Sequence, residues 1–265
     1  MTPLIYKNKI PVAAHRGNSK YFPENTMIAY RSGAEIGSDQ IEIDVHMTKD
    51  GEIVMMHDHK VDRTTDGTGF LHDLTLAEIK ALDAGSWKDP KFAGERVPLF
   101  EEFLAFTKEY PNLSVNVELK DYPAMWGAHA YESAEKTIAL MDRYGLTERA
   151  TVNTWSGELN EWIVSKYGDR IRIHGYWPQD LMGGNQKRYI LDYAYCVCLW
   201  GTPGQRVPDK KLFDYVKSYG VEPWVYYWED DPSLYDRAIE NGAMLFTAND
   251  PEWTMAYLRS KGLHD

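Results

Sequence analysis

The chain has 265 residues, of which 43% are hydrophobic and 13% aromatic, so it can bury a sizeable core and is not globally disordered. Its formal net charge of −11 argues against nucleic acid as a partner and against stable association with anionic membranes. An anionic substrate remains compatible with this charge, because a local cation or metal reverses the sign inside a pocket.

The N-terminal stretch 1–11 lacks the apolar core of a signal peptide, and no apolar run approaches the ~18 residues of a transmembrane helix. Cys196 and Cys198 lack zinc-site spacing, and they are predicted to be buried thiols of a core strand. We therefore expect a cytoplasmic protein, or a periplasmic or secreted one if a signal peptide has been removed. The sequence does not indicate an oligomeric state.

Short apolar segments alternate with amphipathic helical patterns along the chain. The first half is predicted to contain, in order, a strand at 11–15, a helix at 24–37, a hairpin of strands at 40–48 and 52–58, an irregular stretch with a short helix at 75–83, and an amphipathic helix at 100–110. The second half continues with strands at 113–120, 150–155, 170–177, 195–200, 222–228 and 243–248 and helices at 128–144, 157–167, 208–219, 232–241 and 251–261.

This alternation predicts eight strand–helix units without a break in composition. The expected fold is an α/β protein in which residues 1–265 form a single (β/α)8 barrel, with the catalytic groups at the C-terminal ends of the strands. A doubly wound sheet is the alternative, but no glycine-rich phosphate loop follows the first strand.

Three acidic residues are placed to share one site. Glu42 and Asp44 lie two apart in a strand whose other face is apolar, so both carboxylates are expected to point into the barrel, where a cation would stabilise them. Glu118 occupies the equivalent place in the next barrel strand. An all-oxygen set favours a hard cation such as Mg²⁺, Ca²⁺ or Mn²⁺ over zinc. His46 points to the same face of the strand as Glu42 and Asp44 and is a further candidate for metal or substrate contact. For the strand as a whole, the alternative is an exposed strand whose polar residues point to solvent.

Two histidines close predicted strands beside these acids. His15 ends the first strand and His57 ends the hairpin, and imidazole groups suit proton transfer at neutral pH. Arg16 offers a fixed fork of donors for a phosphate. Lys120 faces the same way as the third acid, so it would balance the acids or bind a phosphate. The alternatives are structural histidines and a surface lysine.

Several short motifs occur in a fixed order: AHRG at 14–17, PENT at 23–26, EID at 42–44, TKDG at 48–51, MMHD at 55–58, RTTDGTG at 63–69 and ELK at 118–120. Together they resemble the glycerophosphodiester phosphodiesterase family. The resemblance is close from Pro11 to about Lys120. It implies a TIM barrel with a small insertion, here at 59–97, after the hairpin of the second strand. It also implies one divalent cation, Mg²⁺ or Ca²⁺ with Mn²⁺ possible, on Glu42, Asp44 and Glu118.

The resemblance further implies hydrolysis of a small glycerophosphodiester to glycerol 3-phosphate and an alcohol through a cyclic phosphate. His15 and His57 would be the general acid and base, with Arg16 and Lys120 near the phosphate. A related barrel phospholipase acting on lysophospholipid or sphingomyelin-type substrates is the alternative. A catalytically silent binding protein is less favoured, because none of the matched positions is lost.

The C-terminal half departs from the family pattern. A Trp-Thr-Val-Asn stretch common in the family is replaced by Tyr226-Tyr227-Trp228-Glu229, and the Thr-Asp-x-Pro of the last strand is matched loosely at 247–251. Aromatic residues at successive strand ends are expected either to wall the substrate or to pack beneath loops; they are Trp155, Trp177, Trp200, Tyr226 and Trp228. The departure therefore affects which alcohol fits, and Tyr226 and Trp228 are the predicted substrate contacts.

Overall fold

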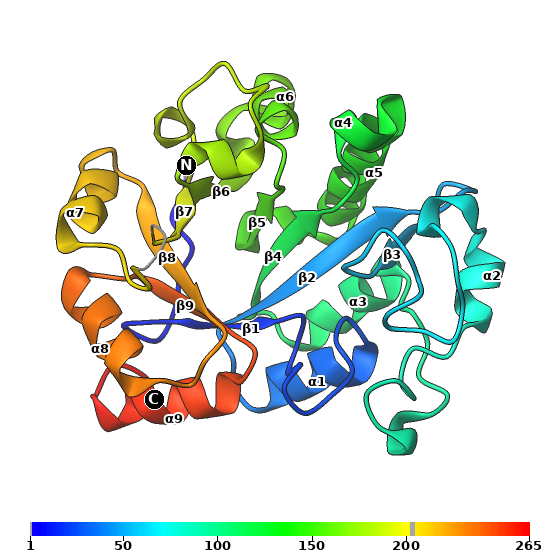
Figure 1. The fold of residues 1–265 in the computed structure, drawn as a ribbon, viewed down its shortest axis with the longest axis horizontal. Coiled ribbons are helices and arrows are strands. Elements are labelled where there is room, and N and C mark those ends of the chain that lie inside the picture. Colours follow the sequence, from blue (N-terminus) through cyan, green and yellow to red (C-terminus); the bar gives the residue numbers. More distant parts are fainter. Residues whose placement is uncertain (1, 202–204) are drawn as a thin grey trace.

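A closed ring of eight parallel strands forms the centre of the structure, a computed structural model that describes residues 2–201 and 205–265 (Figure 1). The barrel strands are β1 (Val12–His15), β2 (Gln40–Met47), β4 (Ser114–Leu119), β5 (Ala150–Asn153), β6 (Arg172–Trp177), β7 (Cys196–Leu199), β8 (Glu222–Tyr227) and β9 (Leu245–Ala248). Pairing of β1 with both β2 and β9 closes the ring. The predicted (β/α)8 barrel is confirmed.

Helices surround this barrel in Figure 1. They are α1 (Met27–Glu35), α3 (Phe100–Phe106), α5 (Ala128–Tyr144), α6 (Gly157–Tyr167), α7 (Lys210–Ser218), α8 (Pro232–Asn241) and α9 (Pro251–Ser260), with the short α2 (Leu76–Ala81) and α4 (Pro123–Trp126). The first helix begins later than predicted because Thr26 is its N-cap, accepting from the amide of Ala29. The connection 178–194 contains 3₁₀ turns at 179–182 and 190–192 in place of an α-helix.

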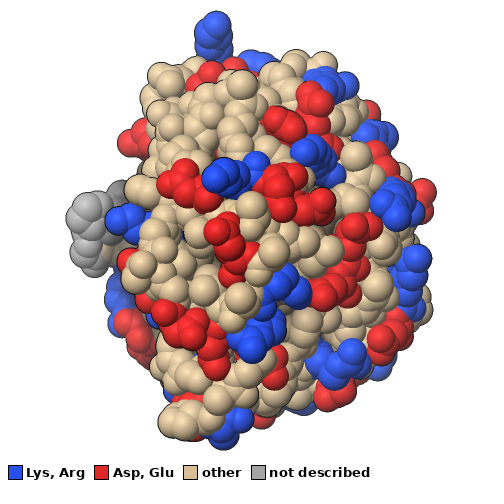
Figure 2. Space-filling model, turned by 90° about the vertical axis from the view of Figure 1, so that its right-hand side faces the viewer, with Lys and Arg blue, Asp and Glu red and all other residues tan. Residues whose placement is uncertain are grey.

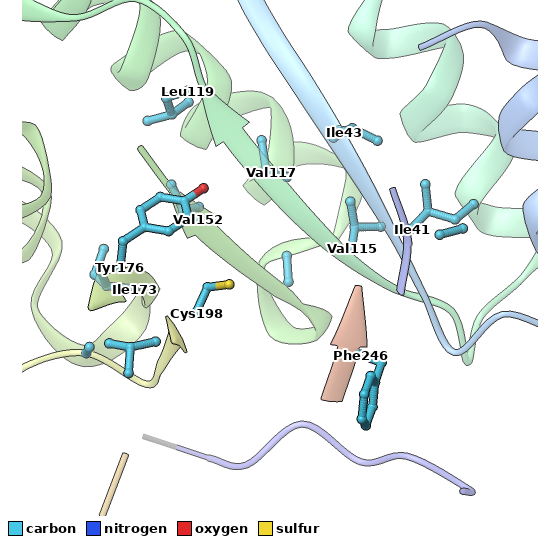
Figure 3. Close-up of a cluster of buried hydrophobic side chains, with 14 of the residues drawn as sticks. Ile41, Ile43, Val115, Val117, Leu119, Val152, Ile173, Tyr176, Cys198 and Phe246 are labelled. Carbon is cyan, nitrogen blue, oxygen red and sulfur yellow. The ribbon is translucent and has the colours of Figure 1, made fainter. Parts of the chain in front are cut away.

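The outer face of the barrel is apolar, as the strand pattern predicts. Ile41, Ile43, Val115 and Val117 belong to one buried hydrophobic cluster, which Figure 3 shows in close-up. Side chains alternate along each strand, so the residues between these positions point into the barrel. The β2–β4 register pairs Asp44 with Glu118, which brings the inward-facing acids to one level.

Strand β3 (Ile53–Met55) pairs antiparallel with β2 and leads into the segment 59–97. This segment and the strand before it have a hydrophobic cluster of their own, formed by Val54, Met56, Val61, Leu71, Ile79, Ala84 and Val97. The face of the molecule in Figure 2 carries acidic and basic side chains interspersed. Within the described part of the chain, no helix is long and apolar enough to cross a membrane.

Candidate active site

Three buried carboxylates meet inside the barrel, two from the middle of β2 and one from near the C-terminal end of β4. Glu42, Asp44 and Glu118 each offer an oxygen within 4.8 Å of the other two. The Oε1 atom of Glu42 is buried without a hydrogen-bond partner among the described residues. Burial, followed by repulsion from Asp44 and Glu118, raises the pKa of Glu42 well above its ordinary value. An unpartnered oxygen in a three-carboxylate cluster fits a hard divalent cation, as predicted from the sequence.

Cationic side chains hold the second of these acids in its charged form. Asp44 lies 3.1 Å from the Lys120 ammonium and 3.3 Å from Nε of Arg16, and it accepts a 2.7 Å hydrogen bond from Asn25. Burial alone would raise the pKa of Asp44, but Lys120 and Arg16 outweigh burial and lower it. Lys120 is only 3% exposed and also contacts Glu118, so the alternative of a surface lysine is wrong.

His15 ends β1 and is oriented by a residue from the far end of the chain. Its Nδ1 donates to Oδ1 of Asn249 at 2.6 Å, and its Nε2 lies 3.8 Å from Glu42. Burial, then the neighbouring Arg16, lowers the pKa of His15 to about 3. The ring is therefore neutral at physiological pH, with the proton on Nδ1 and the lone pair on Nε2.

His57 follows β3 and is oriented by a charged partner instead. Its Nδ1 donates to Asp58 at 2.6 Å, and its side chain is 33% exposed. The hydrogen bond with His57 lowers the pKa of Asp58, and Arg63 lowers it further. A carboxylate at this distance stabilises an imidazolium, which a neutral amide does not do to the same extent. The two histidines are thus oriented by different partners, His15 by a neutral amide and His57 by a carboxylate.

Arg16 sits in a strained turn directly after β1. Its φ is 59°, and its amide donates to Glu42 at 2.9 Å while its guanidinium donates to Glu24 at 2.8 Å. Gly17 follows with a φ of 80°, and a Cβ there would lie 2.6 Å from the backbone of Ala29 in α1. Only glycine fits both the angle and the contact, so the His-Arg-Gly motif fixes the turn that aims Arg16.

One cavity of about 640 Å³ collects these groups. It is lined by His15, Arg16, Glu42, His57, Glu118 and Lys120. Five aromatic residues also line it and are called the aromatic wall: Trp155, Tyr176, Trp200, Tyr226 and Trp228. Tyr226 links this wall to the polar groups, because its ring centroid lies 4.6 Å from that of His15 and 5.0 Å from that of Trp228.

The sequence comparisons agree with this geometry. The sequence model of the glycerophosphoryl diester phosphodiesterase family matches residues 15–174, more than half of the chain. The chain belongs to this family. It is 43% identical to a glycerophosphodiester phosphodiesterase of Caldanaerobacter subterraneus subsp. tengcongensis, over 96% of this chain and 100% of that protein. It is 29% identical to glycerophosphodiester phosphodiesterase 1 of Bos taurus, over 89% of this chain and 77% of that one.

Solved structures of family members share the fold. An Oleispira antarctica phosphodiesterase, in complex with the product sn-glycerol-3-phosphate, has a TM-score of 0.78 at 21% identity, covering 94% of this chain and 96% of that one. A putative glycerophosphoryl diester phosphodiesterase from Silicibacter pomeroyi has a TM-score of 0.81 at 20% identity, covering 98% and 96%.

Two candidates from the sequence lie outside the cavity of this family member. His46 is buried and its Nδ1 lies 2.8 Å from Asp121, so it contacts that acid and does not line the cavity. Trp177 packs with its ring centroid 5.4 Å from that of Tyr189 and is likewise absent from the cavity wall. Trp177 thus follows the second of its two predicted alternatives, packing, and His46 is held by Asp121 away from the cavity lining.

Other lining residues were not singled out from the sequence. Asn116, Asn153, His174 and Tyr176 line the cavity, and each lies on the inward face of its strand. Asn116 stands two residues before Glu118, and Tyr176 donates to Glu118 at 3.1 Å. Strand parity was the signal for them, since polar residues on the inner face of a barrel strand are expected near its mouth.

Both cysteines are buried in β7 and unpaired, as predicted, and Cys198 lines the cavity. Burial, then the negative charge of Glu118, raises the pKa of Cys198 to about 12. A thiolate is therefore scarce at neutral pH.

We expect the native protein to react very slowly with monobromobimane at pH 8 and the urea-unfolded protein to label both thiols rapidly. Fast labelling of the native state would contradict this burial.

Proposed function

We propose that this chain is a metal-dependent phosphodiesterase that hydrolyses glycerophosphodiesters to glycerol 3-phosphate and an alcohol. One observation carries the proposal: two differently oriented histidines line the same cavity as Glu42 and Glu118, two members of a buried three-carboxylate cluster. Membership of the family and the 43% identical relative named glycerophosphodiester phosphodiesterase support it. The relative solved with sn-glycerol-3-phosphate is consistent with the same product.

Glu42, Asp44 and Glu118 would hold one divalent cation, Mg²⁺ or Ca²⁺, with Mn²⁺ also suited to an all-oxygen set. When bound, the cation supplies positive charge beside the phosphate oxygens. Arg16 and Lys120 both line the cavity. Burial alone would lower the pKa of Lys120, but Asp44 and Glu118 outweigh burial and raise it, so both cations suit a phosphate that gains negative charge during the reaction.

The two histidines take opposite roles in the proposed first step. Neutral His15, with its lone pair on Nε2, takes the proton of the glycerol 2-hydroxyl as this oxygen attacks phosphorus. His57, whose Nδ1 is hydrogen-bonded to the Asp58 carboxylate, gives a proton to the departing alcohol oxygen as its bond to phosphorus breaks. A cyclic phosphate results. In the second step His57 takes a proton from water as the water oxygen bonds to phosphorus, and His15 gives its proton to the glycerol 2-oxygen as the bond from that oxygen to phosphorus breaks, which yields glycerol 3-phosphate.

A substrate panel tests the proposal. We expect release of glycerol 3-phosphate from glycerophosphocholine, glycerophosphoethanolamine and glycerophosphoglycerol, measured with and without EDTA. Transient glycerol cyclic phosphate should be visible by ³¹P NMR. The extent of the aromatic wall favours one other candidate, a barrel phospholipase that acts on lysophospholipid. Cleavage of lysophosphatidylcholine without cleavage of glycerophosphocholine would support that candidate and overturn the present one.

Tyr226 and Trp228 are proposed to contact the substrate carbons at the mouth of the cavity. Trp228 is 61% exposed, so its removal should not disturb the core. We expect Trp228→Ala to raise KM for glycerophosphocholine about fivefold with little change in kcat, because an exposed aromatic contact contributes about 1 kcal/mol of binding. Steady-state kinetics would check this, with Trp177→Leu as a strand-end tryptophan outside the cavity for comparison. An unchanged KM in Trp228→Ala would exclude the contact.

A further inference from the structure

Arg63 opens the RTTDGTG motif and lies outside the cavity, so the reaction described above leaves it without a role. We propose that Arg63 is a positioning residue that orients His57 and Arg16 at the same time. The inference rests on the proposed function, because those two residues act there on the proton and on the phosphate. Arg63 would act on each through one intervening carboxylate.

One edge of the Arg63 guanidinium holds the partner of His57. Its Nε donates to Oδ2 of Asp58 at 2.7 Å, and its Nη2 donates to Oδ1 at 3.0 Å. The same Oδ1 accepts the 2.6 Å hydrogen bond from Nδ1 of His57. Both oxygens of Asp58 are therefore fixed, and with them the plane in which the imidazole must lie.

The other edge holds the partner of Arg16. Nη1 and Nη2 of Arg63 donate to the two oxygens of Glu24 at 2.9 and 2.8 Å. Oε1 of Glu24 also accepts a 2.8 Å hydrogen bond from Nη1 of Arg16. A continuous chain of hydrogen bonds thus runs from His57 through Asp58, Arg63 and Glu24 to Arg16.

Only arginine can make this bridge. Four N–H groups on two edges of one rigid plane engage two carboxylates, whereas a lysine ammonium is a point charge that cannot pair bidentately with both. Arg63 itself is 43% exposed, while Glu24 is 12% exposed. An exposed ion pair adds little to stability, so the effect expected of this bridge is geometric.

The rest of the motif keeps Arg63 in place. Val61, two residues earlier, is fully buried in the hydrophobic cluster of the insertion, and its carbonyl accepts from the Thr65 hydroxyl at 2.6 Å. The amide of Gly67 donates to that hydroxyl at 3.0 Å, and a Cβ on Gly67 would lie 2.7 Å from the Leu82 side chain. The insertion therefore presents Arg63 from a rigid turn.

The test compares Arg63→Met with Asp58→Asn and Glu24→Gln, alone and in pairs, on glycerophosphocholine. We expect Arg63→Met to lower kcat about 10–100-fold, as is typical when a group behind a reacting residue is lost, and to raise KM as well. Asp58→Asn should act mainly on kcat and Glu24→Gln mainly on KM. In each double variant the fold-loss in the kinetic constants should be far smaller than the product of the two single-variant losses. The reason is that both substitutions interrupt the same chain of hydrogen bonds.

Two further variants complete the test. Arg63→Lys should recover less than half of the activity lost in Arg63→Met, on a logarithmic scale, because lysine restores the positive charge without the planar set of N–H donors. Arg31→Met is the matched control: Arg31 is 46% exposed and pairs with Glu109 at 3.2 Å, and its replacement should leave both constants unchanged. Unchanged kcat and KM in Arg63→Met, or fully multiplicative losses in the pairs, would overturn the inference alone. A parent enzyme inactive on every diester would overturn the proposed function instead.

Discussion

Replacing His57 with alanine is expected to lower kcat for glycerophosphocholine by about 10²–10⁴-fold, the usual contribution of a positioned acid or base. The choline oxygen leaves as an alkoxide unless it is protonated, and His57 is the proposed donor because it lines the cavity and the Asp58 carboxylate accepts from its Nδ1. The same variant should lose far less on glycerophospho-p-nitrophenol, because p-nitrophenolate leaves without a proton. Stopped-flow or steady-state kinetics on the two substrates measures the difference.

His15→Ala provides the contrast. The kcat of this variant should fall by a similar factor on both substrates, because the glycerol hydroxyl must give up its proton whichever group departs. Unfolding curves should show that both variants stay folded, as both histidines line the cavity. Equal losses on the two substrates in His57→Ala would contradict its role as the acid. Near-normal turnover in either variant would remove that histidine from the mechanism.

Much of this arrangement follows from strand periodicity. Alternation along the strand predicted that Glu42 and Asp44 face inward. The strand predicted at 113–120 placed Glu118 beside them, and the register pairs it with Asp44, while Lys120 lies one residue beyond the end of β4. Parity also decides between the two alternatives left open for Trp177. Trp177 follows the inward-facing Tyr176 and therefore points outward, away from the cavity, although both stand at the end of β6. Applying parity to every strand-end aromatic residue would have separated these two.

Other features depend on contacts that periodicity does not encode. His46 has inward parity, yet it stands two residues beyond the level of Asp44 and Glu118, where Asp121 meets it. Asn249 orients His15 across 234 positions of sequence, and Asn25 adopts a φ of 54° to reach Asp44. Such contacts depend on loop conformation, which is set by tertiary packing and not by local pattern.

Removing the divalent cation is expected to abolish turnover and lower stability together. A ligand that binds only the folded state at 100 times its Kd adds about 2.7 kcal/mol to the free energy of unfolding. For a chain of this size that corresponds to a rise in Tm of roughly 5–10 °C. Thermal unfolding of EDTA-treated protein, with Mg²⁺, Ca²⁺ or Mn²⁺ added back singly, measures the rise without relying on activity.

Glu42→Gln makes this test specific to the carboxylate cluster. Without a cation, Glu42 is buried beside two other acids, so removing its charge should raise the Tm of the EDTA-treated protein. The glutamine oxygen can still accept from the amide of Arg16, as Glu42 does at 2.9 Å. The added cation should then give little further rise in Tm and no recovery of activity. A full cation-dependent rise in this variant would place the cation elsewhere, and an unchanged Tm in the parent protein on adding all three cations would contradict a metal at this cluster.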